Sequence, residues 1–253
     1  LIDVCIRVFL FYYVPRINLF CKRSTNPFDF VRIPFKWYPP VIYEFGNNHV
    51  GALQFSYVMS NGEVLASYAY NGKQNKSNQS DCQFLHWSAK GVLIDSMIVQ
   101  GGQHGSSFGY DEANNLIYSQ IKDLSGGKNW LATFPYTPHA VINSGSSMVT
   151  KWCESETYVR PNVDLTNGLW IGSQMDGTVE VCNISDLKAG NYFPIIRFKL
   201  QDFGWNPVPS GVTNNGKYNT IQANSIAYPY AFFTAGDVNN KDDRLVMCIN
   251  LIT

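Results

Sequence analysis

The sequence predicts an all-β protein, and three features of the chain lead to that prediction. Aromatic residues make up 15% of the 253 residues and charged residues only 15%, and tyrosine and phenylalanine favour strands over helices. The 20 glycines and 12 prolines supply turns along the whole chain. Short apolar runs alternate with polar residues, and a 3.6-residue helical period is missing.

A phrase that reads strand, turn, strand occurs four times. The four copies are QFSYVMSNGEVLASY from Gln54, HGSSFGYDEANNLIYSQ from His104, RPNVDLTNGLWIGSQ from Arg160 and QANSIAYPYAFFTAG from Gln222. The second begins 50 residues after the first, the third 56 after the second, and the fourth 62 after the third. Such a period, with several short strands in each unit, is typical of a β-propeller.

Further strand-like runs supply the rest of each blade. They are CQFLHWS and GVLIDSMIV in the first unit, WLATFPY and KWCESE in the second, GTVEVCNIS and FPIIRFKL in the third, and only RLVMCINLIT in the fourth. Because a propeller has to close its ring, we expect strands from residues 1–50 to complete this short last unit. The runs available are IRVFLFYYV, FVRIPFKWY and PVIYEF.

These observations define the expected domain organisation. Residues 1–50 complete the ring, residues 51–253 carry the repeats, and the whole chain forms a single domain. Four openings are clear and the 50 leading residues can complete or add a unit, so we predict five blades, with four as the alternative. The turn-rich inserts at residues 71–80, 125–129 and 206–219 are interpreted as loops between strands.

Charge and cysteine usage exclude several classes of partner. The chain carries 19 Lys and Arg residues against 19 Asp and Glu residues, so it has no broad basic field for nucleic acid or an anionic membrane. The apolar run at residues 8–14 lies between Arg7 and Arg16 and is too short to span a membrane. The six cysteines show no paired spacing of a zinc site, and Cys182 and Cys248 are predicted to be buried thiols.

The repeated phrases resemble a known family. HGSSFGYDEANNLIYSQ, RPNVDLTNGLWIGS with GTVEVCNISDL, and QANSIAYPYAFFTAGD are similar to the propeller shared by receptor-binding proteins of phages of Gram-positive hosts, helveticin-like bacteriocins and teichoic acid biosynthesis protein C. The resemblance covers about residues 50–253. It implies a five-bladed propeller that binds a cell-surface glycopolymer, with no catalytic set to carry over.

Catalytic residues are not evident in the sequence. The four histidines, His49, His86, His104 and His139, lie in no tight metal-ligand spacing, and no serine lies in a G-x-S-x-G motif. We therefore expect neither a metal nor another cofactor, and no enzyme activity. A set of acidic residues is explained by turn capping, namely Asp111, Glu112, Asp164, Asp176 and Asp186. A hydrolase of a glycan or phosphodiester with a pair of such acids remains the alternative.

The candidate ligand-binding residues are those that open the repeats. The first strand of each blade lines the axis of a propeller, so Gln54, His104, Arg160 and Gln222 are expected to form a polar ring. The competing interpretation is that they only tie one blade to the next. Trp205, beside a glycine and an Asn-Pro pair, is added as an exposed aromatic residue that could stack on a sugar.

The predicted function is thus non-catalytic binding of a cell-wall glycopolymer, teichoic acid or a related glycan. The protein would act outside the producing cell, in a phage tail or as a secreted bacteriocin. Its other expected partners are phage tail proteins or further copies of itself. A scaffold for protein partners is a third class of function, and it would require a large apolar surface patch.

Overall fold

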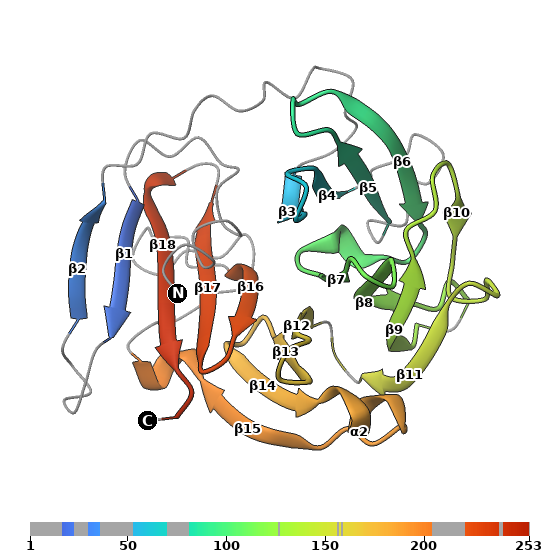
Figure 1. Cartoon of the computed structure of the whole chain (residues 1–253). Helices are drawn as coiled ribbons and strands as arrows, with labels where there is room; N and C mark the ends of the chain where they lie inside the picture. The colour runs from blue at the N-terminus through green and yellow to red at the C-terminus, as the bar shows by residue number, and fades with distance from the viewer. Residues whose placement is uncertain are drawn as a thin grey trace.

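The computed structural model describes residues 17–22, 30–35, 53–69, 81–125, 127–155, 157, 159–203, 221–237 and 240–252. These residues form an all-β propeller of four sheets, each a blade, arranged around a common centre (Figure 1). The first two blades are β3 (Leu53–Val58), β4 (Val64–Ala69), β5 (Cys82–Trp87), β6 (Leu93–Val99) and β10 (Val141–Ile142), then β7 (Gly109–Asp111), β8 (Leu116–Lys122), β9 (Asn129–Pro135) and β11 (Thr150–Ser155).

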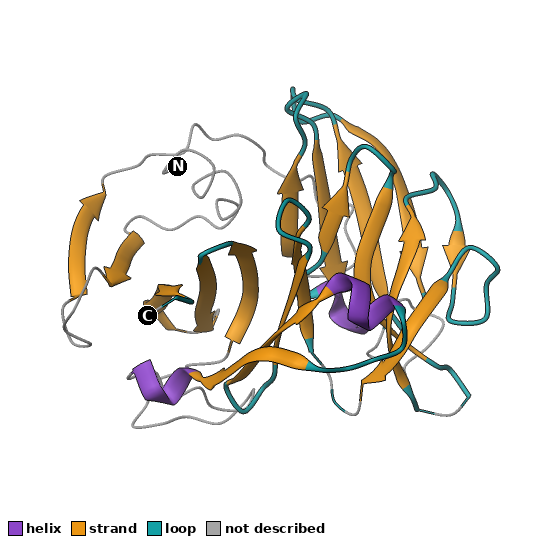
Figure 2. Cartoon of the chain, turned by 60° about the horizontal axis from the view of Figure 1, so that its bottom comes forward, coloured by secondary structure: helices purple, strands orange, loops and turns teal. Residues whose placement is uncertain are grey.

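The third and fourth blades follow the same plan. The third is β12 (Arg160–Asp164), β13 (Leu169–Ser173), β14 (Thr178–Asn183) and β15 (Pro194–Lys199), and the fourth is β16 (Ile221–Ala227), β17 (Tyr230–Asp237), β18 (Asn240–Asn250), β1 (Ile17–Lys22) and β2 (Phe30–Phe35). Besides the turn η1 (Gln103–Gly105), the described helical segments are α2 (Ile184–Lys188) and η2 (Leu200–Phe203). Figures 1 and 2 show α2 and η2 at the two ends of β15.

The four repeated phrases form the inner hairpin of each blade. Strands β3, β7, β12 and β16 lie nearest the centre in Figure 1, and β12 packs against both β7 and β16. Each inner strand turns back through a short loop into the second strand, as in the pairing of Asp164 with Leu169. The alternation of apolar and polar residues therefore predicted the element type and its place in the blade.

The fourth blade combines strands from distant parts of the chain. Strand β1 pairs with β18 in parallel, with Leu19 opposite Val246, and β2 pairs antiparallel with β1. Residues 17–22 and 30–35 thus extend an existing sheet instead of starting a new one. The predicted fifth blade is not confirmed, and the four-blade alternative fits the described sheets. The runs IRVFLFYYV and PVIYEF lie outside the described residues.

Large apolar side chains pack between neighbouring blades. The rings of Phe55 and Phe84 meet the ring of Phe108 edge to face, with centroids 5.2 and 5.1 Å apart. Trp170 fills the space between the second and third blades and is only 1% exposed. Full burial of such a side chain stabilises the fold by about 1.5–3 kcal/mol, so these contacts fix how the blades sit against each other.

The cysteine prediction is confirmed for the described residues. Cys182 and Cys248 are buried free thiols, as are Cys82 and Cys153. Burial raises the pKa of the Cys182 thiol to about 12, with smaller contributions from nearby Glu180, Cys153 and Asp186. In the described part of the chain, no helix is long and apolar enough to cross a membrane.

Candidate functional site

The centre of the propeller is held by buried neutral hydrogen bonds. Asn162, 6% exposed on β12, donates from Nδ2 to the Phe108 carbonyl at 2.7 Å. Its Oδ1 accepts from the backbone N–H of Ile226 at 3.3 Å. One carboxamide therefore joins the second, third and fourth blades, and these bonds offset the cost of burying it.

Asn224 on β16 lies at the same centre and is fully buried. Its backbone carbonyl accepts from Ser107 Oγ at 2.7 Å, and its Oδ1 accepts from Ser173 Oγ at 2.8 Å. Within the described residues, its Nδ2 has no hydrogen-bond partner. A buried donor without an acceptor costs about 1–3 kcal/mol, so this amide is a place where a bound group would gain affinity.

Arg160 and His104 are brought together beside these amides. Arg160 is the register partner of Ser173, is 5% exposed, and donates from Nη2 to the Met175 sulfur at 2.8 Å. Burial, and then the nearby charge of Arg160, lower the pKa of His104. At neutral pH the imidazole is therefore uncharged and can donate one hydrogen bond and accept another. We call Ser107, His104, Arg160, Asn162, Ser173 and Asn224 the axial cluster.

The predicted position of His104 in the repeat differs from the observed one. His104 lies in the turn η1, with a positive φ of 67°, and not in the inner strand. Arg160 precedes the turn residue Asp164 by four positions, and Ser107 precedes the matching Asp111 by four. The second-blade equivalent of Arg160 is therefore Ser107. The sequence pattern does not reveal this shift, because the phrases were aligned on their first polar residue and the turn η1 at His104 was not recognised.

The other predicted ligand residues are less closely associated with the centre. Gln54 on β3 is half-buried, and its Oε1 accepts from Ser106 Oγ at 3.5 Å. Gln222 on β16 is exposed. Trp205 lies outside the described residues.

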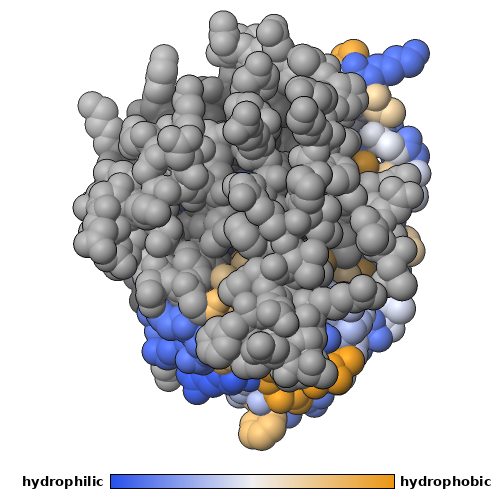
Figure 3. All heavy atoms as spheres, turned by 90° about the vertical axis from the view of Figure 1, so that its left-hand side faces the viewer, coloured by the Kyte–Doolittle hydropathy of each residue, from blue (hydrophilic) through white to orange (hydrophobic). Residues whose placement is uncertain are grey.

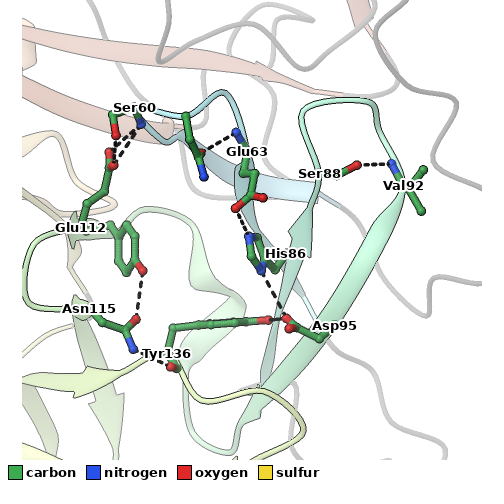
Figure 4. Close-up of polar contacts among 11 residues, drawn as sticks. Ser60, Glu63, His86, Ser88, Val92, Asp95, Glu112, Asn115 and Tyr136 are labelled. Atoms are coloured by element: carbon green, nitrogen blue, oxygen red, sulfur yellow. Dashed lines mark hydrogen bonds and ion pairs between the residues drawn. The ribbon is translucent and has the colours of Figure 1, made fainter.

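A second polar group, which the sequence did not single out, lies between the first and second blades (Figure 4). His86 Nε2 is 3.0 Å from Glu63 Oε2, and His86 Nδ1 is 3.5 Å from Asp95 Oδ1. Tyr136 donates from its hydroxyl to the same Asp95 oxygen at 2.5 Å. Glu63, His86, Asp95 and Tyr136 are called the His86 network below. Its members come from four separate segments, so no local pattern could reveal it.

Glu112 ties the same two blades together nearby (Figure 4). Its carboxylate accepts from the backbone N–H and the hydroxyl of Ser60, at 3.0 and 2.7 Å. It also accepts from the Tyr57 hydroxyl at 3.0 Å. Burial alone would raise the pKa of Glu112, but the hydrogen bonds from Ser60 and Tyr57 outweigh it and lower the pKa below its usual value. The ionised carboxylate is thus the form that the fold prefers.

Of the aspartates considered as candidate acids, Asp111, Asp164 and Asp176 cap turns as predicted, whereas Asp186 lies in the helix α2. Asp111 accepts from the N–H of Asn114, and Asp164 does the same for Asn167. Asp176 accepts from Thr178, and Asp186 accepts from Asn183. Glu112 bonds to another blade, and Asp164 also accepts from the backbone N–H of Tyr228 on the fourth blade at 2.8 Å. A search of the described residues finds no group of three His, Cys, Asp or Glu side chains placed to hold a metal ion.

Trp130 lies at the edge of the core, whereas Trp87 and Trp170 are buried. Trp130 is half-buried and donates from Nε1 to Asp123 at 2.9 Å. The ammonium groups of Lys128 and Lys151 lie 5.8 and 4.9 Å from its ring centroid. Both lysines are also paired with carboxylates. Two cations therefore already lie over the Trp130 ring.

Comparisons with known proteins show a sequence likeness to one bacterial protein and a fold likeness to a phage tail fiber. No family model matches the sequence. The putative major teichoic acid biosynthesis protein C of Bacillus subtilis (strain 168) is 22% identical over 232 residues, covering 87% of this chain and 48% of that protein. The tail fiber of Staphylococcus aureus phage P68 superposes with a TM-score of 0.57 at 15% identity, covering 82% of this chain and 38% of that one. The chain therefore spans less than half the length of either protein, and it shares the propeller fold of the tail fiber.

Proposed function

We propose that this chain binds a bacterial cell-surface glycopolymer, teichoic acid or a related glycan, without turning it over. It would do so outside the producing cell, as part of a phage tail or as a secreted bacteriocin. The observation that carries the proposal is the match to the teichoic acid biosynthesis protein, because it extends over 87% of the chain. The shared fold with a phage tail fiber is consistent with it.

The axial cluster supplies the chemistry for an anionic polyol-phosphate. Arg160 carries a positive charge at a buried position, and a guanidinium can form forked, charge-assisted hydrogen bonds with a phosphate. The Asn224 Nδ2 donor and the His104 ring add uncharged groups for ester or hydroxyl oxygens. Low exposure to water strengthens such contacts.

Binding is favoured over hydrolysis by the surroundings of the acidic residues. Asp111, Asp164 and Asp176 accept hydrogen bonds within their own turns, and Asp186 accepts from Asn183 at the start of α2, so each of these carboxylates already serves a structural contact. A glycosidase needs two carboxyl groups facing one bond. The same experiment tests both functions: purified Gram-positive walls, with and without their teichoic acid, are incubated with the protein.

We expect the protein to sediment with intact walls, to lose most of this binding on stripped walls, and to release no phosphate, glycerol or reducing sugar. Reproducible release that disappears on substitution of one Asp or Glu would replace binding by hydrolysis. Failure to sediment with either wall preparation would remove the glycopolymer proposal.

The residue to test first is Arg160. Arg160→Ala should weaken wall binding by about 1–3 kcal/mol, and by more at low than at high ionic strength. Lys90→Ala is the matched control, because Lys90 is an exposed cation on a different blade. Both variants are first checked for an unchanged melting transition. A folded Arg160→Ala protein with full binding would assign the axial cluster a purely structural role.

A further inference from the structure

An open cavity of about 390 Å³ lies in the third blade, where β14 begins and β15 ends. Its polar lining consists of Gln174, Asp176, Thr178, Arg197, Lys199 and Asp202. Met175, the residue that accepts from Arg160, sits between two of them in the same turn. The volume falls in the range of about 300–1,000 Å³ that is usual for small-molecule sites.

A buried carboxylate holds two of the lining side chains in place. Glu180 is 4% exposed and accepts from Arg197 Nε at 3.1 Å, from the Tyr192 hydroxyl at 2.6 Å and from Gln174 Nε2 at 3.4 Å. Arg197 is thereby anchored although its side chain is 67% exposed. Anchoring before binding reduces the entropy that a ligand has to overcome.

The charges of the lining cancel. Arg197 and Lys199 are opposed by Asp176 and Asp202, and Lys199 Nζ is 3.7 Å from Asp176 Oδ2. An anionic ligand would gain no net attraction here, in contrast to the axial cluster. Donors and acceptors are both present, and Phe198 also contributes to the lining. This combination suits hydroxyl groups on a partly apolar ring.

The outward face of β15 extends the cavity along the strand. Ile195 is 46% exposed and shares one face with Arg197 and Lys199 because alternate residues of a strand point the same way. Phe193, just before the strand, is 69% exposed. At about 3.3 Å per residue, Phe193 lies roughly 13 Å from Arg197. Figure 3 shows hydrophilic side chains beside hydrophobic ones at the lower end of the molecule, where Figure 1 places β15.

We propose that the cavity binds one uncharged, hydroxyl-rich sugar unit of a glycan, and that Phe193 stacks on a neighbouring unit. Arg197 donates hydrogen bonds to the sugar hydroxyl groups. The side-chain oxygen of Gln174, Oε1, accepts hydrogen bonds from them. The inference rests on the proposed function for the source of the glycan, since the sugar substituents of the bound polymer would occupy the site.

Titration of the 15N-labelled full chain with a panel of neutral monosaccharides and their methyl glycosides tests the site, with glycerol 3-phosphate as the anionic probe. We expect at least one neutral sugar to cause saturable shifts of the Gln174, Thr178 and Lys199 amides at millimolar concentration. Glycerol 3-phosphate should leave these amides unchanged. No saturable shift with any neutral sugar, or shifts with glycerol 3-phosphate alone, would overturn the inference.

Variants then identify the contacts. Gln174→Ala and Arg197→Ala should each raise the dissociation constant for the sugar about tenfold, whereas Lys90→Ala should not change it. Arg197→Lys is measured alongside, because it keeps a cation near Glu180 and loses only the forked donor. Phe193→Ala should weaken a disaccharide several-fold and leave the monosaccharide unaffected. Equal affinity of all these folded variants would place the sugar elsewhere.

Wall binding separates the two proposals. If the cavity variants lose the sugar shifts but sediment fully with walls, the polymer is bound elsewhere. In that case only the claim that the polymer fills the cavity fails, and the glycopolymer function stands. If the parent protein shows the sugar shifts but does not sediment with walls, the glycopolymer function fails and the sugar site remains.

Discussion

Two contacts between blades are built from different chemistry. At the axis, the second, third and fourth blades are joined by uncharged amide and hydroxyl groups, with Asn162 and Asn224 at the centre. Away from the axis, the first and second blades are joined by carboxylates, through Glu112 and the His86 network. Neutral bonds hold at any ordinary pH, whereas the ionic ties depend on protonation. The four sheets should therefore respond unequally to acid.

The largest effect should come from breaking the axial contact. Asn162→Ala removes two hydrogen bonds and leaves the Phe108 carbonyl and the Ile226 N–H buried without a partner. We expect a loss of about 2–4 kcal/mol in the free energy of unfolding, measured by urea denaturation. Asn191→Ala, at an exposed position, should stay within about 0.5 kcal/mol of the parent. Equal values for both variants would contradict a central role for Asn162.

Breaking the tie at Glu112 should cost less. Glu112→Gln keeps the shape but removes the charge that accepts from Ser60 and Tyr57, and we expect a loss of about 1–2 kcal/mol. The same denaturation experiment measures it. A loss as large as that of Asn162→Ala would mean that the two contacts are energetically alike.

A smaller effect is expected for Tyr136→Phe, which deletes only the hydroxyl that donates to Asp95. The loss should be about 1 kcal/mol. Tyr228→Phe, at a 39% exposed position, is the control and should be neutral. If Tyr136→Phe is also neutral, the His86 network does not stabilise the fold.

The smallest effect is the pH dependence of the stability that Glu112 contributes. It is also the sharpest test of the difference between the two contacts. Because hydrogen bonds lower the pKa of Glu112 below the ordinary 4.5, its contribution to stability is present above about pH 4.5 and is lost as the pH falls through the lowered value. Stability curves of the parent and of Asn162→Ala should therefore fall in parallel on acidification. Glu112→Gln should fall less steeply, and an unchanged slope for that variant would show that the acid response arises elsewhere.

The sequence predicted the repeating architecture but not the number of blades. The four phrases from Gln54, His104, Arg160 and Gln222 became the inner hairpins, since alternation and turn residues act locally. The number of blades depended on whether β1 and β2 pair with β18 or with each other alone. That choice is set by contacts across more than 200 residues, which no local pattern encodes.

The axial cluster was predicted only in part, again because contacts between distant parts of the chain are not visible in a local sequence pattern. Arg160 opens its strand and was found at the centre, whereas Asn162 and Asn224 look like ordinary strand residues in sequence. Their importance comes from partners on other blades. The cavity beside Lys199 was not predicted either, because its lining comes from a turn, two strands and a helical turn that only the folded blade brings together.

The parallel pairing of β1 with β18 also determines how the molecule would respond to mechanical force. Chain entering at Ile17 and chain leaving at Asn250 attach to opposite ends of these two parallel strands. Tension applied through both ends would slide β1 along β18 and load their backbone hydrogen bonds together, not one after another. A propeller closed in this way would resist pulling better than one closed by an antiparallel hairpin.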